Sequence, residues 1–111
     1  MTEKQKKYLS DILQAVLVIE EFVIGVKNFD DYVKDKKTRS AVERQLSIIG
    51  EAVSKFAKEN PQHDLKNTGQ IIAFRNWLIH AYDSINHATV WAIIQRHLPA
   101  LKKETMEKLN R

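Results

Sequence analysis

Apolar residues recur every three or four positions along most of the chain, which is the spacing of amphipathic helices. In the first segment the recurring residues are Tyr8, Ile12, Val16, Ile19, Val23 and Val26. This pattern predicts a long helix that ends within residues 25–28. The stretch "NFDDYVKD" then predicts a short helix or turn, with Phe29, Tyr32 and Val33 directed inward.

A third helix is predicted from apolar positions with 4-3-4-3 spacing, namely Val42, Leu46, Ile49, Val53 and Phe56. Thr38 can cap its start, and the pattern stops before Pro61. Gly50 and Ala52 lie within this apolar seam. Such small residues permit a neighbouring helix to approach closely, so the seam resembles a bundle interface.

Two further helices follow a polar loop at residues 61–67. Asn67 or Thr68 can cap the fourth helix, and Asn86 can cap the fifth. Pro99 is expected to kink or restart the last helix. The fifth helix is predicted to bury Val90, Ile93, Ile94 and Leu98. With few Gly and Pro and no period-two alternation, the sequence predicts an all-α fold, a single bundle of four to five helices over residues 1–111.

Length and composition narrow the possible functions. A chain of 111 residues buries only about two-thirds of the surface of its unfolded form, which favours a symmetric dimer. The absence of cysteine excludes disulfides, thiolate metal sites and cysteine nucleophiles, and it fits a cytoplasmic location. No secretion signal is expected in "MTEKQKKYLS", and no membrane span, because Glu20 and Glu21 interrupt the most apolar run. A net charge of +4 favours approach to a polyanion such as RNA.

The fourth helix carries the stretch "RNWLIHAY", in which polar residues interrupt an apolar segment. With Ile71 as zero and about 100° per residue, one apolar face spans about 240° to about 340°. It is formed by Phe74, Trp77, Leu78 and Ala81. Ile72 lies outside it at about 100°, and Ile79 at about 80°. A helix that is apolar on two sides exceeds what one small bundle needs, so the second side is expected to contact another copy.

The polar residues separate on the same helical wheel. Asn76 lies at about 140° and His80 at about 180°. Arg75, at about 40°, and Tyr82, at about 20°, lie on another stripe. Arg75 and His80 are therefore about 140° apart on a regular helix. Their cooperation requires the reach of the arginine, a distorted turn, or the same residues from a second subunit.

A structural role competes with a functional one for these side chains. A histidine in an apolar helix is more often a hydrogen-bonded structural residue, and Arg75 could pair with Glu51 or Asp83. Placing a guanidinium, a carboxamide and an imidazole near one another in an apolar segment is nevertheless costly unless each finds partners. Such arrangements are typical of functional sites.

The stretch "RNWLIHAY" resembles the Arg-x4-His-x-Tyr signature of the HEPN superfamily. The similarity extends to "TRSAVERQLSIIGEAVSKFAKE" and "VWAIIQRHLPALKKE", which resemble the preceding and final helices of HepT-like toxins. It covers nearly the whole chain, and the three segments in this order are more specific than the Arg-x4-His string alone.

The resemblance implies an all-α homodimer in which two copies of the motif line a cleft at the subunit interface. It implies a metal-independent endoribonuclease, the toxin of a type VII-like toxin–antitoxin pair. By position, Arg75 and His80 become the catalytic pair, and Asn76 takes a supporting polar role. The partner implied is a nucleotidyltransferase antitoxin of the MNT type, which attaches AMP groups to the motif tyrosine, here Tyr82.

The chemistry of histidine and arginine agrees with the ribonuclease activity that the resemblance implies. Histidine titrates near neutral pH and serves as acid or base, while arginine offers a permanent charge and a planar fork of donors for phosphate oxygens. No cofactor is expected. No metal site is expected either, since His63, His87 and His97 match no ligand spacing. Glu51, beside Gly50, is expected to point towards the motif helix and to orient Arg75 or His80.

A second class of function remains open. The same helical fold can act as a non-catalytic accessory or substrate-binding subunit of a nucleotidyltransferase. Growth arrest on expression separates the two, because it should depend on Arg75 only in a nuclease.

Overall fold

The computed structural model describes residues 1–110, apart from the side chain of Tyr82, and its elements are all helical. The long helices are α1 (Glu3–Phe22), α3 (Lys36–Glu59), α4 (Thr68–His80) and α6 (Leu98–Leu109). The short elements are α2 (Phe29–Lys34), the 3-10 turn η1 (Tyr82–Ser84), α5 (His87–Ala92) and the π-helical segment η2 (Ile93–His97). The all-α prediction is confirmed.

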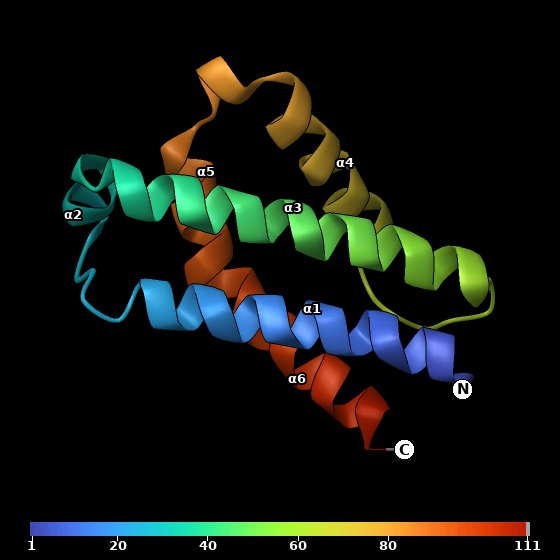
Figure 1. Ribbon diagram of the computed structural model, residues 1–111. Coiled ribbons are helices and arrows are strands. Elements are labelled where there is room, and N and C mark those ends of the chain that lie inside the picture. The colour runs from blue at the N-terminus through green and yellow to red at the C-terminus, as the bar shows by residue number, and fades with distance from the viewer. Residues whose placement is uncertain (111) are drawn as a thin grey trace.

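The centre of the bundle is the pair α1 and α3, which run side by side in opposite directions (Figure 1). Helix α6 packs against α1, whereas α4 packs against α3 and slants away from it (Figure 1). The apolar seams predicted for the two central helices are the ones that meet. The predicted members that are fully buried are Ile12, Val16, Ile19, Val42, Val53 and Phe56, whereas Tyr8 is only partly buried and its neighbour Leu9 is fully buried.

Two helix ends and the exposure of one side chain differ from the prediction. α1 stops at Phe22, earlier than residues 25–28, and Phe29 is exposed although Tyr32 is fully buried. α3 is capped by Asp35 rather than Thr38, because the Thr38 N–H and hydroxyl both donate to the Asp35 carboxylate. These hydrogen bonds lower the pKa of Asp35 below its ordinary value.

The last helical stretch behaves as the sequence predicts. The Asn86 side chain caps α5 by accepting a hydrogen bond from the Thr89 N–H, at 3.0 Å. Pro99 lies in the first turn of α6, directly after the π-helical segment η2, and the regular α-helix restarts there. Within residues 1–110, no helix combines the length and apolar character that a membrane span requires.

Candidate active site

Helix α4 is placed by the loop that precedes it. Leu65 is buried and anchors the loop, and the backbone N–H of Lys66 donates to the carboxylate of Glu104 on α6. Asn67 has a φ of 63°, in the left-handed region that asparagine tolerates better than most residues, and its side chain makes no cap bond. The helix that follows ends at His80, because Ala81 leaves helical geometry.

Arg75 lies at the crossing of α4 and α3. The side chain is half-buried, and its first carbons lie against Gly50 of α3. Its Nε is buried and makes no hydrogen bond within the part of the chain that the structure describes. The guanidinium therefore starts between the two helices, with its Nε donor enclosed at the crossing.

This crossing corrects the orientation predicted for α4. Of the four residues assigned to its core face, Leu78 is buried, Phe74 and Trp77 pack partly against the core, and Ala81 is partly exposed. The aromatic rings of Phe74 and Trp77 pack on each other, with centroids 5.3 Å apart. The helix is rotated so that the stripe around Arg75 faces α3.

His80 and Asn76 lie on the outer surface of α4, and both are exposed. Ile79, beside Asn76 on the wheel, is 48% exposed, whereas Ile72 packs partly against the core. A substrate can therefore reach the imidazole of His80 without any movement of the bundle. The exposed Ile79 is the part of the second apolar stripe that the bundle leaves uncovered.

Arg75 and His80 are not joined by any hydrogen bond or ion pair found among residues 1–110. Helix α4 is regular over its whole length, so the distorted turn considered above is absent. About 140° on a regular helix thus separates the two residues. Two routes to cooperation remain: the reach of the arginine, or a second copy of the chain.

Glu51 lies on the side of α3 that borders α1. Its carboxylate pairs with Lys55 at 3.4 Å, and its side chain is 59% exposed. Together with Tyr8 and Asp11 of α1, it lines a shallow hollow of about 150 Å³. The structure therefore places Glu51 beside α1, away from Arg75 and His80.

Tyr82 lies in η1, immediately after the end of α4. Its side chain is outside the described part of the structure, so the predicted modification site is placed only along the chain. Tyr82 follows His80 after a single intervening residue, Ala81, at which the helix ends.

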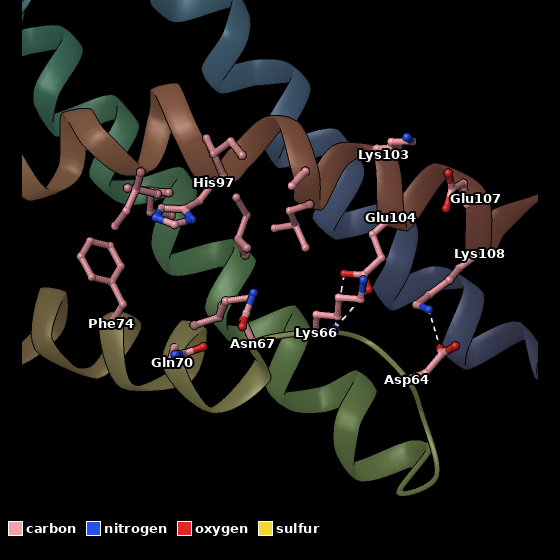
Figure 2. A pocket seen from close by; sticks show the side chains of 17 residues that line it. Asp64, Lys66, Asn67, Gln70, Phe74, His97, Lys103, Glu104, Glu107 and Lys108 are labelled. Atoms are coloured by element: carbon pink, nitrogen blue, oxygen red, sulfur yellow. Dashed lines mark hydrogen bonds and ion pairs between the residues drawn. The ribbon is translucent and has the colours of Figure 1, made fainter.

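A larger groove, of about 850 Å³, separates α4 from η2 and α6 (Figure 2). Its floor is apolar, and Phe74 and His97 border it. Charged side chains also line it, including the buried Lys108, which pairs with Asp64 (Figure 2). None of Arg75, Asn76 and His80 lines this groove. The motif and the groove therefore occupy different sides of α4.

A second arginine–histidine pair was not predicted from the sequence. Arg39 of α3 contacts Nε2 of His87 at 3.0 Å. Because arginine only donates, His87 accepts through Nε2 and carries its proton on Nδ1. Burial raises the pKa of neighbouring Glu43, although His87 and Arg39 act against the rise. Burial is also the main reason that the pKa of Tyr32 is raised.

This second pair joins α3 to α5. The buried Arg39 Nε, His87 Nδ1 and Tyr32 hydroxyl make no hydrogen bonds among the described residues. The pair was not predictable from the sequence, because its two members are 48 positions apart along the chain. Across residues 1–110, no three His, Asp or Glu side chains gather closely enough to hold a metal ion.

The chain is similar to proteins described as ribonucleases. A family model with the description "Ribonuclease HepT-like" matches residues 12–107. A "Probable ribonuclease HepT" from Thermococcus cleftensis is 37% identical over 117 residues, which span the full length of both chains.

Two other relatives have similar coverage. A "Putative RNase" from Caldanaerobacter subterraneus subsp. tengcongensis is 36% identical over 107 residues, covering 96% of this chain and 95% of that protein. A "Putative RNase" from Methanocaldococcus jannaschii is 37% identical over 106 residues, covering 92% and 84% respectively. No solved structure is significantly similar to the chain.

Proposed function

We propose that this chain, which belongs to the ribonuclease HepT-like family of the HEPN superfamily, is a metal-independent endoribonuclease. The observation that carries the proposal is an exposed His80 on the same helix as Arg75, in a chain whose relatives are described as RNases. The test is cleavage of tRNA and mRNA by the purified protein in EDTA.

The reaction is attack of the RNA 2′-hydroxyl oxygen on the neighbouring phosphorus. The bond from phosphorus to the 5′-oxygen breaks, which leaves a 2′,3′-cyclic phosphate and a free 5′-hydroxyl. A base removes the 2′-hydroxyl proton and an acid protonates the leaving oxygen, and histidine can fill either role. The guanidinium of Arg75 binds the non-bridging oxygens, where charge develops in the transition state.

The proposed site is shared by two copies of the chain. A single His80 cannot hold both proton roles at once, and a regular α4 keeps it about 140° from Arg75. A symmetric dimer provides a second histidine and a second arginine. The exposed Ile79, on the same side of α4 as Asn76, is the apolar surface that such a contact would cover.

Replacing Ile79 with glutamate is expected to prevent dimerisation and to abolish RNA cleavage. A carboxylate at the centre of an apolar contact is buried without a partner, which disfavours association. Light scattering measures the mass of the protein in solution, and the same sample is assayed for cleavage. Met106→Glu is the matched control, because Met106 is also exposed but lies on α6. A monomeric wild type that cleaves RNA would contradict the shared site.

The proposed biological role is that of a toxin, acting in the cytoplasm and silenced by a nucleotidyltransferase antitoxin of the MNT type. Support comes from the family and from the position of Tyr82, just beyond the end of the motif helix. An AMP group on this tyrosine would add a phosphodiester charge and considerable bulk two positions along the chain from His80. Like charges repel, so the modified protein should bind RNA weakly.

Incubation with the antitoxin and ATP is expected to add AMP to Tyr82 and to stop RNA cleavage. Mass spectrometry of the intact protein and its peptides should show adducts of AMP mass on the wild type and none on Tyr82→Phe. Tyr8→Phe is the control, since Tyr8 lies on α1, outside the motif. An unmodified wild type, or equal modification of Tyr82→Phe, would contradict this role of Tyr82.

A further inference from the structure

Helices α3 and α4 are in close contact at Gly50. A Cβ added there would lie 2.3 Å from Cβ of Arg75, 2.6 Å from its Cγ and 3.5 Å from the carbonyl oxygen of Ile71. Cβ atoms in real structures do not approach other heavy atoms to less than 3.0 Å. The same addition at Gly25 or Gly69 would meet no atom within 4 Å. Packing therefore leaves no room for a side chain at Gly50, whereas Gly25 and Gly69 both have room for one.

Space, rather than backbone conformation, explains the glycine at this position. Gly50 lies inside the 24-residue helix α3, and its φ is not positive. Alanine would be favoured over glycine in such a helix interior. The unfavourable residue is therefore accommodated because α4 occupies the volume that a methyl group would need.

The atoms that fill this volume belong to the stem of Arg75. The position of its Cβ is set by the α4 backbone, so no change of rotamer can move that atom away from Gly50. A side chain at Gly50 would instead have to displace α4 as a whole. The buried Nε of Arg75 shows that the guanidinium begins inside the same crossing.

We infer that Gly50 is a positioning residue for Arg75. It touches no substrate, but its missing side chain lets α4 seat the arginine stem directly on α3. This contact fixes the position of the guanidinium. It also fixes the position of α4, and therefore of His80, relative to a second copy of the chain. This inference rests on the proposed function, because positioning matters to catalysis only if Arg75 binds the RNA phosphate.

The kinetic test compares Gly50→Ala with Gly69→Ala, two glycine-to-alanine changes within helices. Gly50→Ala is expected to lower kcat by about 100-fold, the loss that a displacement of about 1 Å produces, with a smaller change in KM. Gly69→Ala should keep the wild-type kcat. Equal kcat values for both variants and the wild type would overturn the inference.

The packing test needs no RNA, so it stays informative if the nuclease proposal fails. Gly50→Ala is expected to lower the melting temperature by about 5–10 °C through overpacking. In an Arg75→Gly background, which removes the contacting stem, the same change should not lower it. An equal decrease in both backgrounds would show that Gly50 serves helix packing in general and would overturn the role toward Arg75.

Should Gly50→Ala alone fail to fold, the double variant decides the question. Folding of Gly50→Ala/Arg75→Gly supports the steric contact between the two positions, since the glycine has only been moved to the facing helix. Failure of the double variant to fold, while Arg75→Gly folds, would overturn it. Circular dichroism measures both outcomes.

Discussion

Replacing His80 with alanine is expected to lower kcat for RNA cleavage by about 10²- to 10⁴-fold, the contribution typical of general acid–base catalysis. The imidazole is exposed at the last position of α4, so its removal leaves the buried core unchanged. The loss should therefore appear in kcat without a fall in melting temperature. Single-turnover cleavage of a labelled RNA, with circular dichroism on the same sample, measures both quantities.

The matched control for this prediction is His97→Ala. His97 is also exposed, but it belongs to η2 and borders the groove rather than the motif. Its replacement should leave kcat unchanged. If His80→Ala cleaves RNA as fast as the wild type, the assignment of His80 fails. If the wild type cleaves no RNA either, a non-catalytic subunit of a nucleotidyltransferase becomes the better description.

Replacing Arg75 with alanine is expected to lower kcat by about 10²- to 10³-fold, as loss of one preorganised donor to a developing oxyanion commonly does. The kcat of Arg75→Lys should lie between the kcat of the wild type and that of Arg75→Ala. Lysine keeps the positive charge and the alkyl stem that packs on Gly50, but it lacks the planar fork of donors. Cleavage rates of the three proteins, measured at saturating RNA, test this order.

Growth provides a second readout for the arginine. Expression of the wild type without an antitoxin should arrest bacterial growth, and Arg75→Ala should relieve the arrest. Arg96→Ala is the control, since Arg96 is an exposed arginine of η2 outside the motif. Arrest that persists in Arg75→Ala, or harmless expression of the wild type, would contradict the toxin proposal.

The elements that local chemistry determines were predictable from the sequence. The 4-3-4-3 apolar spacing predicts α3, and Asn86 predicts the start of α5 because its side chain reaches the Thr89 N–H. Pro99 predicts a restart because it cannot donate a helical hydrogen bond. Asp35, rather than Thr38, caps α3, because its carboxylate accepts hydrogen bonds from both the N–H and the hydroxyl of Thr38.

The orientation of α4 was not predictable from its own pattern. The wheel assigns the core to the side with the largest apolar surface, Phe74 and Trp77. Phe74 and Trp77 pack only partly against the core, and the helix presents the stem of Arg75 to α3, because Gly50 leaves room for a close approach there. Which stripe of a helix is buried thus depended on a residue in another helix.

The candidate site was predictable in part. The motif stretch identified Arg75, Asn76 and His80, and the structure leaves the last two exposed. Glu51 was expected near them because it follows Gly50, but one position is a rotation of about 100° and turns its carboxylate to the α1 side. The Arg39–His87 pair was missed since only the folded chain brings its members together.

The most direct test of the central claim is the chemistry of the RNA ends that the purified wild type produces in EDTA. Attack by the RNA's own 2′-hydroxyl predicts fragments with 2′,3′-cyclic phosphate and 5′-hydroxyl ends, identified by mass spectrometry and absent with His80→Ala. RNA that carries a single 2′-deoxy nucleotide at the cleavage position should stay intact. Uncut RNA, 5′-phosphate ends, or the same fragments with His80→Ala would contradict the account.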